Sequence, residues 1–176
     1  MTSYARSANR PAKLVLTPRY PRPEQEYLAI IKAGGKISGD AATKLFDQLK
    51  PIEPSFLMGE WEGGDLDIGH PITQELKRIN WAGKTFRTEE DVDPVVVRGT
   101  GGERTFMELH GRARVREVKF RGVVSAAMVY DDKPIIDHFR FVSEDIVAGI
   151  MDTKIAPPGY HFYLTRYRIE LVKSKL

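Results

Sequence analysis

The amino-acid sequence predicts a mainly β protein, with helices near the N-terminus followed by an antiparallel, meandering β-barrel of about nine strands. From Gly83 onward, short segments with alternating apolar residues are separated by turn residues. Two helical apolar stripes come before Gly59. Trp61 then stands between Gly59 and Gly63 in a strand-like run. A tryptophan fills a wide apolar base, and a glycine on either side lets another chain or a ligand approach the backbone.

The composition indicates one packed domain in a reducing environment. The chain has 176 residues, of which 41% are hydrophobic and 29% charged, so a core can form without metals or disulfides. The chain has no cysteine, which excludes disulfides, thiolate catalysis and cysteine-based zinc sites and favours a cytoplasmic location. No run approaches the ~18 apolar residues of a membrane-spanning helix.

The charge pattern gives no indication of a nucleic-acid partner. The net charge of +3 is spread along the chain, and neither an aromatic ribonucleoprotein motif nor a helix-turn-helix pattern is present. The one basic cluster includes Arg112, Arg114 and Arg116, which share one face of a predicted strand. We interpret it as the solvated face of an edge strand, with peripheral contact to an anionic membrane surface as the alternative.

The chain divides into three predicted parts. Residues 1–22 contain several prolines and predict an irregular N-terminal arm. Residues 23–52 predict a helical pair that packs on the barrel. Residues 53–176 predict the barrel domain itself.

The helices are predicted from their caps and apolar stripes. Residues 24–33 carry acids in the first turn and end at Gly34, which stops the helix. Ser38 is an N-cap for a second helix over 39–49. A third, short helix over 72–79 would place its apolar side chains on one face.

The remaining segments predict the strands of the barrel. They follow the strand around Trp61 and cover 83–88, 93–98, 104–109, 112–121, 122–130, 134–142, 145–152 and 160–172. Within 112–121 the apolar residues change parity between Val115 and Val118. This change predicts a bulge or sharp bend near Arg116 and Glu117.

The predicted hairpin over 122–142 is apolar on both faces. With Asp132 and Lys133 as the turn residues, Met128 lies opposite Asp137. A hairpin with two apolar faces is buried on both sides. One face would line the barrel, and the other would meet the N-terminal helices or a partner subunit. The sequence leaves open which face points inward.

The sequence carries no catalytic signature. It has no nucleophile elbow, phosphate-binding loop or dinucleotide fingerprint. Asp137 and His138 lie in the middle of a strand and point to opposite faces, which argues against an acid–base pair. Two interpretations remain open. His138 and Arg140 anchor a ligand head group, or Asp137 forms an internal salt bridge with a lysine or arginine across the barrel.

Several strings of the sequence closely resemble the bacterial GxWxG protein family and the domain of unknown function that follows it. These strings are Met58–Gly63, Gly69–Pro71, Trp81–Phe86, Gly111–Gly122 and Met128–Phe139. Together they span roughly residues 25 to 172. The resemblance implies relatives but no settled chemistry.

The Gly-x-Trp opening is also similar to that of calycin-type barrels, namely lipocalins, fatty-acid-binding proteins and nitrobindins. That likeness implies a calycin-like barrel with an internal apolar cavity. Nitrobindins hold haem through a histidine near the C-terminal end, and His161 is the corresponding candidate here. His138 is the second candidate for a haem iron.

We therefore expect a protein that binds or carries a hydrophobic ligand with an anionic head group, a fatty acid or phospholipid, in the barrel cavity. The expected ligand-binding residues are Trp61, Lys84, Phe86, Met128, Tyr130, Asp137, His138, Phe139, Arg140, Phe141 and Tyr163. The four histidines are scattered, so neither a metal nor a cofactor is expected, and no enzymatic activity is assigned. The alternatives are a haem-binding, nitrobindin-like protein and a homodimeric structural or partner-binding module.

Overall fold

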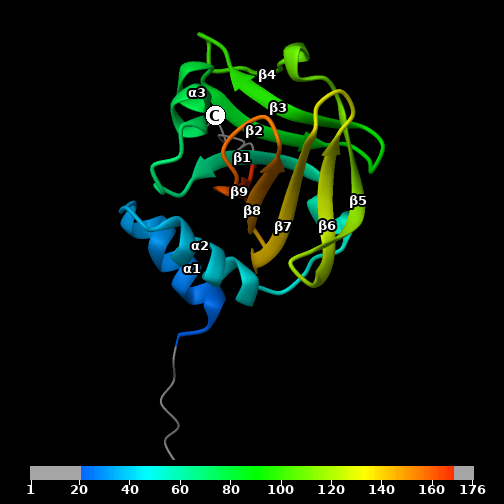
Figure 1. The fold of residues 1–176 in the computed structure, drawn as a ribbon. Helices are drawn as coiled ribbons and strands as arrows, with labels where there is room; N and C mark the ends of the chain where they lie inside the picture. The colour runs from blue at the N-terminus through cyan, green and yellow to red at the C-terminus, as the bar shows by residue number, and fades with distance from the viewer. Residues whose placement is uncertain (1–20, 169–176) are drawn as a thin grey trace, which may run out of the picture.

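Antiparallel strands close into a barrel in the computed structural model, which describes residues 21–168 (Figure 1). The strands are β1 (Gly59–Asp65), β2 (Trp81–Phe86), β3 (Val92–Arg98), β4 (Arg104–Phe106), β5 (Ala113–Phe120), β6 (Val123–Tyr130), β7 (Ile135–Ser143), β8 (Ile146–Thr153) and β9 (Tyr160–Arg166). The helices are α1 (Pro23–Ala33), α2 (Gly39–Gln48) and α3 (Ile72–Arg78), with short 3-10 turns η1 (Pro54–Leu57) and η2 (Glu108–His110).

The strand order is β2-β1-β9-β8-β7-β6-β5-β3, and a further pairing of β2 with β3 closes the barrel. β4 is an extra strand on β3. The predicted fold class, a mainly β antiparallel barrel preceded by helices, is confirmed. Most of the predicted arm lies in residues 1–20, outside the described residues. No helix in the part of the chain that the structure describes is long and apolar enough to cross a membrane.

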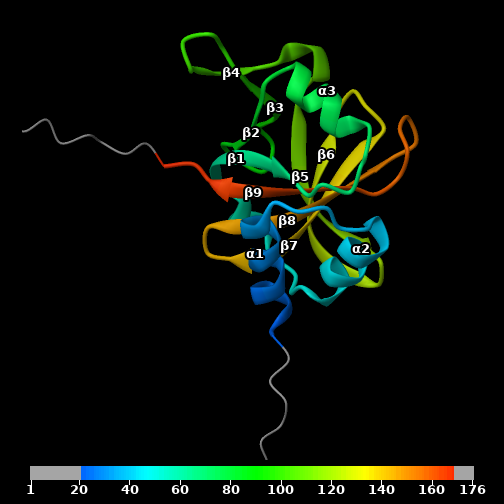
Figure 2. The ribbon, with the colours of Figure 1, turned by 90° about the vertical axis from the view of Figure 1, so that its left-hand side faces the viewer.

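Helices α1 and α2 cover one side of the barrel, whereas α3 lies at its other end (Figures 1 and 2). Two apolar clusters result. The first fills the barrel and includes Trp61, Met128 and Phe139. The second lies outside the barrel, where Tyr27 and Phe46 of the helices pack on β7, β8 and β9. The helices thus bury an outer sheet face that would otherwise expose apolar side chains to water.

The hairpin of β6 and β7 takes the predicted register, with Met128 opposite Asp137. Its inner face carries Met128 and Phe139, and its outer face carries Val142 beneath the helices. The helices cover the outer face around Val142, whereas Val129 and Ile136, nearer the turn, are only partly buried and line a surface recess.

The predicted bulge near Arg116 and Glu117 is absent, because β5 pairs with β6 in one unbroken register. The parity change has a different cause. Val115 packs inside the barrel, while Phe120 packs on the helix-covered cluster outside it. The strand therefore buries opposite faces at its two ends. The barrel instead shifts register between β2 and β3, on both sides of Gly83.

The Gly-x-Trp-x-Gly segment closes the barrel through close packing. Trp61 is fully buried, and its indole N–H donates to the Leu57 carbonyl at 2.6 Å. A Cβ at Gly63 would stand 2.4 Å from the ring of Trp81. Only glycine therefore leaves room for the Trp81 ring against β1 at this position.

His161 lies where the helices contact the barrel. From its burial there we predict that the protein loses stability in acid. Its side chain is fully buried, with Nε2 3.0 Å from the Thr43 hydroxyl. Burial is the main cause that lowers the pKa of His161 to about 4. The unfolded chain binds this proton near pH 6.5, whereas the folded chain does not, so stability falls as the pH drops from 6.5 towards 4.

We expect His161 to contribute about 2 kcal/mol to the stability lost between pH 7 and pH 5. Urea unfolding of the wild type and of His161→Phe at both pH values measures this contribution. The variant should lose less stability than the wild type over the interval. An equal loss in both proteins would contradict the assignment.

Candidate functional site

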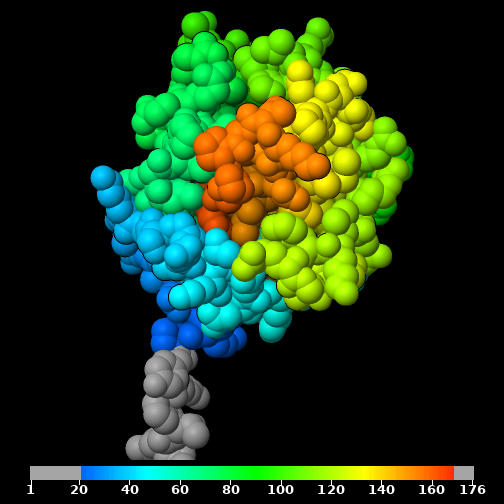
Figure 3. Space-filling view, viewed as in Figure 1, coloured from blue at the N-terminus to red at the C-terminus, as the bar shows by residue number. Residues whose placement is uncertain are grey.

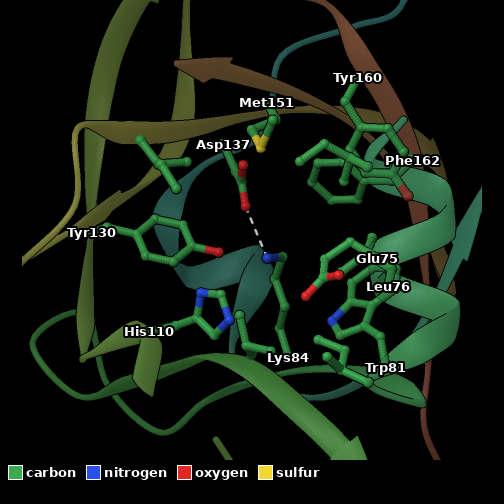
Figure 4. A pocket seen from close by; sticks show the side chains of 14 residues that line it. Glu75, Leu76, Trp81, Lys84, His110, Tyr130, Asp137, Met151, Tyr160 and Phe162 are labelled. Atoms are coloured by element: carbon green, nitrogen blue, oxygen red, sulfur yellow. Dashed lines mark ion pairs between the residues drawn. The ribbon is translucent and has the colours of Figure 1, made fainter. Parts of the chain in front are cut away.

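An apolar pocket of about 100 Å³ opens at the end of the barrel that α3 flanks. Its walls come from α3 and from strands on several sides of the barrel (Figure 4). The lining residues are Ile72, Glu75, Leu76, Ile79, Trp81, Lys84, Val95, His110, Tyr130, Ile135, Asp137, Met151, Tyr160 and Phe162. We call it the inner pocket.

A second recess of about 380 Å³, the outer groove, adjoins the inner pocket and shares Ile72, His110, Ile135 and Met151 with it. Leu109 and Ile155 line the groove with apolar side chains that are 76% and 64% exposed. In the space-filling view, the segment around residues 150–160 (orange) lies between α3 and the β6–β7 hairpin (Figure 3). His70 Nε2 contacts the Pro157 carbonyl at 3.0 Å and ties this segment to the start of α3.

A buried ion pair forms the polar part of the inner pocket. Lys84 Nζ lies 2.8 Å from Oδ2 of Asp137, and both side chains are almost fully buried. Lys84 Nζ also donates to the Pro94 carbonyl at 2.9 Å. Lys84 stands on β2 and Asp137 on β7, so the barrel brings the two strands face to face. This is the internal salt bridge that the sequence left open.

Three aromatic rings surround the Lys84 ammonium group. Its Nζ lies 5.7 Å from the Trp81 ring centre, 5.8 Å from that of Tyr130 and 5.3 Å from that of Phe162. The negative ring faces attract the cation and replace part of its lost hydration. An ammonium group has three N–H donors, and Asp137 and Pro94 take two of them. One donor remains for a ligand.

The pocket shifts the protonation of its other groups. Burial raises the pKa of Asp137, although the neighbouring Lys84 opposes the rise. Burial also raises the pKa of Tyr130 well above its usual value, with a further contribution from Asp137, so the hydroxyl keeps its proton. Burial, and then Lys133 and Lys84, lower the pKa of His110. At neutral pH the site therefore holds a neutral phenol and a neutral imidazole beside the pair of Lys84 and Asp137.

Stability alone does not account for the ion pair. Replacing a buried pair with well-packed apolar side chains is often neutral or stabilising. An ionisable pair with a perturbed pKa in a pocket is a candidate functional site. The pair of Lys84 and Asp137, with the hydroxyl of Tyr130 directed towards it, is therefore the candidate site of this protein (Figure 4).

The structure brings three of the expected ligand-binding residues together in the inner pocket, namely Lys84, Tyr130 and Asp137. Five others belong to the packed interior of the barrel and do not line the pocket: Trp61, Phe86, Met128, Phe139 and Phe141.

The remaining three expected residues, His138, Arg140 and Tyr163, lie on the outer face of the sheet. His138 stacks on Phe120 at 3.8 Å. Arg140 lies over the Phe46 ring at 5.1 Å, and Tyr163 packs on the helix-covered cluster. Arg140 and Tyr163 therefore pack against the helix-covered cluster, His138 packs against β5, and none of the three lines the inner pocket.

Sequence reasoning missed Trp81, Phe162 and the lining residues of α3. Signals for them were present. The predicted helix over 72–79 had one apolar face, and that face now closes the pocket. Trp81 comes just before Gly83 and Lys84, and its ring reaches the pocket because the register shifts there.

The described residues contain no group of three His, Asp or Glu side chains placed to hold a metal ion. His110 is the one histidine among the lining residues of the inner pocket. His161, the candidate haem ligand, is instead buried beneath α2 against Thr43 and Phe46.

Comparison with known proteins identifies related sequences. A family model described as "GXWXG protein" matches residues 44–102, and one described as "Domain of unknown function (DUF4334)" matches residues 111–166. The crystal structure of a protein from Thermomonospora curvata is similar, with 42% sequence identity and a TM-score of 0.79. The match covers 83% of this chain and 99% of that one. No curated protein matches.

Proposed function

The chain belongs to the GXWXG protein family and carries the C-terminal domain of unknown function DUF4334, and from its pocket we propose that it binds a hydrophobic ligand with an oxygen-bearing head group inside the barrel. One observation carries the proposal. An apolar pocket ends at a buried ammonium group with a donor to spare, beside a phenol hydroxyl. Pockets of this kind, apolar with a few converging polar groups, are typical of small-molecule sites.

The free hydrogen-bond donors of the pocket favour a ligand whose head group carries a hydrogen-bond acceptor. The remaining N–H of Lys84 and the hydroxyl of Tyr130 both donate, so a carbonyl or carboxylate oxygen fits between them. A carbonyl docks on the neutral ion pair without adding net charge. The carboxylate of a fatty acid adds an anion, which is favourable once Asp137 takes up a proton. Burial raises the pKa of Asp137 and so eases that uptake.

The volume of the inner pocket limits what enters it. At about 100 Å³ it is smaller than a cavity of about 150 Å³ that holds benzene, so it receives a head group and the first few carbons. The rest of a single chain would lie along the outer groove, gaining up to about 0.8 kcal/mol per buried CH₂. A single-chain ligand such as a fatty acid or ketone fits this path better than a two-chain phospholipid.

We also propose that the outer groove makes peripheral contact with an anionic membrane, because Lys133 lies there among apolar side chains. The arginine cluster on β5 gives it less support. Arg112, Arg114 and Arg116 pair with Asp93, Asp131 and Glu90 respectively.

The geometry gives little support to the two alternative functions, haem binding and a homodimeric partner-binding module. A haem-sized ligand exceeds the inner pocket, and α1 and α2 cover part of the hairpin face that suggested a homodimer. Kinship with calycin-type barrels and a cytoplasmic location stay predictions.

Removing one hydroxyl tests the proposed site with little disturbance of the fold. Tyr130→Phe should weaken the binding of 2-decanone or decanoate about 5- to 10-fold, since a hydrogen bond contributes about 1–1.5 kcal/mol. Tyr163→Phe, on the outer face, is the matched control and should bind like the wild type. Isothermal titration calorimetry measures both. The proposal fails if neither compound binds the wild type saturably, or if the two variants lose affinity equally.

A further inference from the structure

We propose that the inner pocket also moves a proton on a carbonyl ligand, with Asp137 as the base and with Lys84 and Tyr130 holding the carbonyl oxygen. This inference rests on the proposed function, because the ligand must first bind with its oxygen at Lys84. It adds a reaction class, enolisation of an apolar ketone or aldehyde, to the binding site.

The positions of the three groups carry the inference. Tyr130 and Asp137 come from the neighbouring strands β6 and β7, Lys84 comes from β2 across the barrel, and the three side chains converge in an apolar pocket (Figure 4). A carbonyl oxygen at the free N–H of Lys84 lies beside the carboxylate of Asp137, because Nζ and Oδ2 are only 2.8 Å apart. The carbon next to the carbonyl is then within reach of the carboxylate. Among the described residues, Lys84 is the one ion-pair partner of Asp137, and it contacts Oδ2.

The step balances without a further reagent. The bond between the α-carbon and its hydrogen breaks, and the proton forms an O–H bond on the Asp137 carboxylate. The electron pair moves through the α-carbon into the carbonyl, which becomes an enolate. The negative charge on its oxygen lies against the Lys84 ammonium group and the Tyr130 hydroxyl. Isotope exchange follows when the proton on Asp137 is replaced by a solvent deuteron and that deuteron is delivered to the same carbon, whereas delivery to a conjugated carbon shifts a double bond.

The surroundings favour this chemistry over other uses of the same residues. Burial raises the pKa of Asp137, which makes the carboxylate a stronger base than an exposed one. The apolar walls strengthen the attraction between the ammonium group and an enolate. Lys84 is less suited to act as a nucleophile. Its bonds to Asp137 and Pro94 hold it as an ammonium group, and imine formation needs a free amine.

Deuterium exchange tests the inference with a defined probe. 2-Decanone is incubated with the full chain in deuterated buffer, and proton NMR follows the loss of its C1 and C3 signals. The wild type should accelerate exchange over buffer. Asp137→Asn should lower the accelerated rate at least 100-fold, Tyr130→Phe about 10-fold, and Tyr163→Phe should leave it unchanged. The wild-type rate should rise with pH as Asp137 loses its proton.

The outcomes separate the two proposals. Saturable binding of 2-decanone without faster exchange overturns the inference and leaves the binding function standing. Absence of binding overturns both. If Asp137→Asn does not fold, an unchanged rate in Tyr130→Phe or a rate independent of pH overturns the inference. A mass increase on Lys84 after treatment with cyanoborohydride and the ketone would also overturn it, by identifying Lys84 as the reacting group.

Discussion

Replacing Lys84 alone with methionine should lower the free energy of unfolding by about 3–5 kcal/mol at neutral pH. The side chain of Asp137 stays buried in the barrel after the substitution, but its cation is gone. A buried carboxylate without a partner must either remain charged in an apolar site or take up a proton, and both cost free energy. The penalty should shrink as the pH falls, because protonation removes the uncompensated charge.

The double variant Lys84→Met/Asp137→Leu is the matched control for this prediction. It removes both charges and keeps apolar volume, so it should recover most of the lost stability. Urea unfolding of the wild type and of the single and double variants measures the effect. A single variant within about 1 kcal/mol of the wild type would show that the pair is not buried as described.

Gly83→Ala should have an equal or larger effect on folding. Gly83 lies in β2 with φ +127°, a conformation that side chains rarely adopt. A Cβ there would stand 2.0 Å from the Trp61 carbonyl oxygen and 2.7 Å from the Gly63 amide nitrogen. Both obstacles are backbone atoms of the neighbouring strand, so no side-chain movement relieves them. We expect a loss of more than about 4 kcal/mol, or no folded protein.

Gly69→Ala separates steric overlap from the conformational cost. Gly69 also has a positive φ, +74°, but a Cβ there would meet no atom within 4 Å. We expect this variant to lose about 1 kcal/mol. Circular dichroism and urea unfolding compare the two variants. Equal stability of Gly83→Ala and Gly69→Ala would refute the close contact between β1 and β2.

The sequence predicted helices and strands well where nearby residues, such as caps and turn residues, determine them. The helix over 24–33 ends at Gly34, as its cap predicted, and the register of the β6–β7 hairpin follows from its two turn residues. The parity change in β5 was misread as a bulge. Local pattern cannot tell a bulge from a strand that meets the core at one end and a helix at the other.

The candidate site was harder to predict, because distant segments build it. Lys84 and Asp137 were both among the expected residues, but their pairing depends on how β2 and β7 face each other across the barrel. For the same reason, the sequence could not decide which face of the β6–β7 hairpin points into the barrel. Both faces are apolar, and α1 and α2 fix which one lies outside. His138 and Arg140 therefore became packing residues, although their chemistry suits a ligand.

The two tryptophans allow the most direct test of a ligand-binding barrel. The indole N–H of Trp81 donates to the Gly83 carbonyl at 2.9 Å at the wall of the inner pocket, whereas that of Trp61 donates to Leu57 in the packed interior. Nitrogen-15 NMR during titration with 2-decanone or decanoate resolves both signals. We expect a saturable shift of the Trp81 indole signal and a nearly constant Trp61 signal. A Trp81 signal that stays constant with both compounds would contradict this expectation.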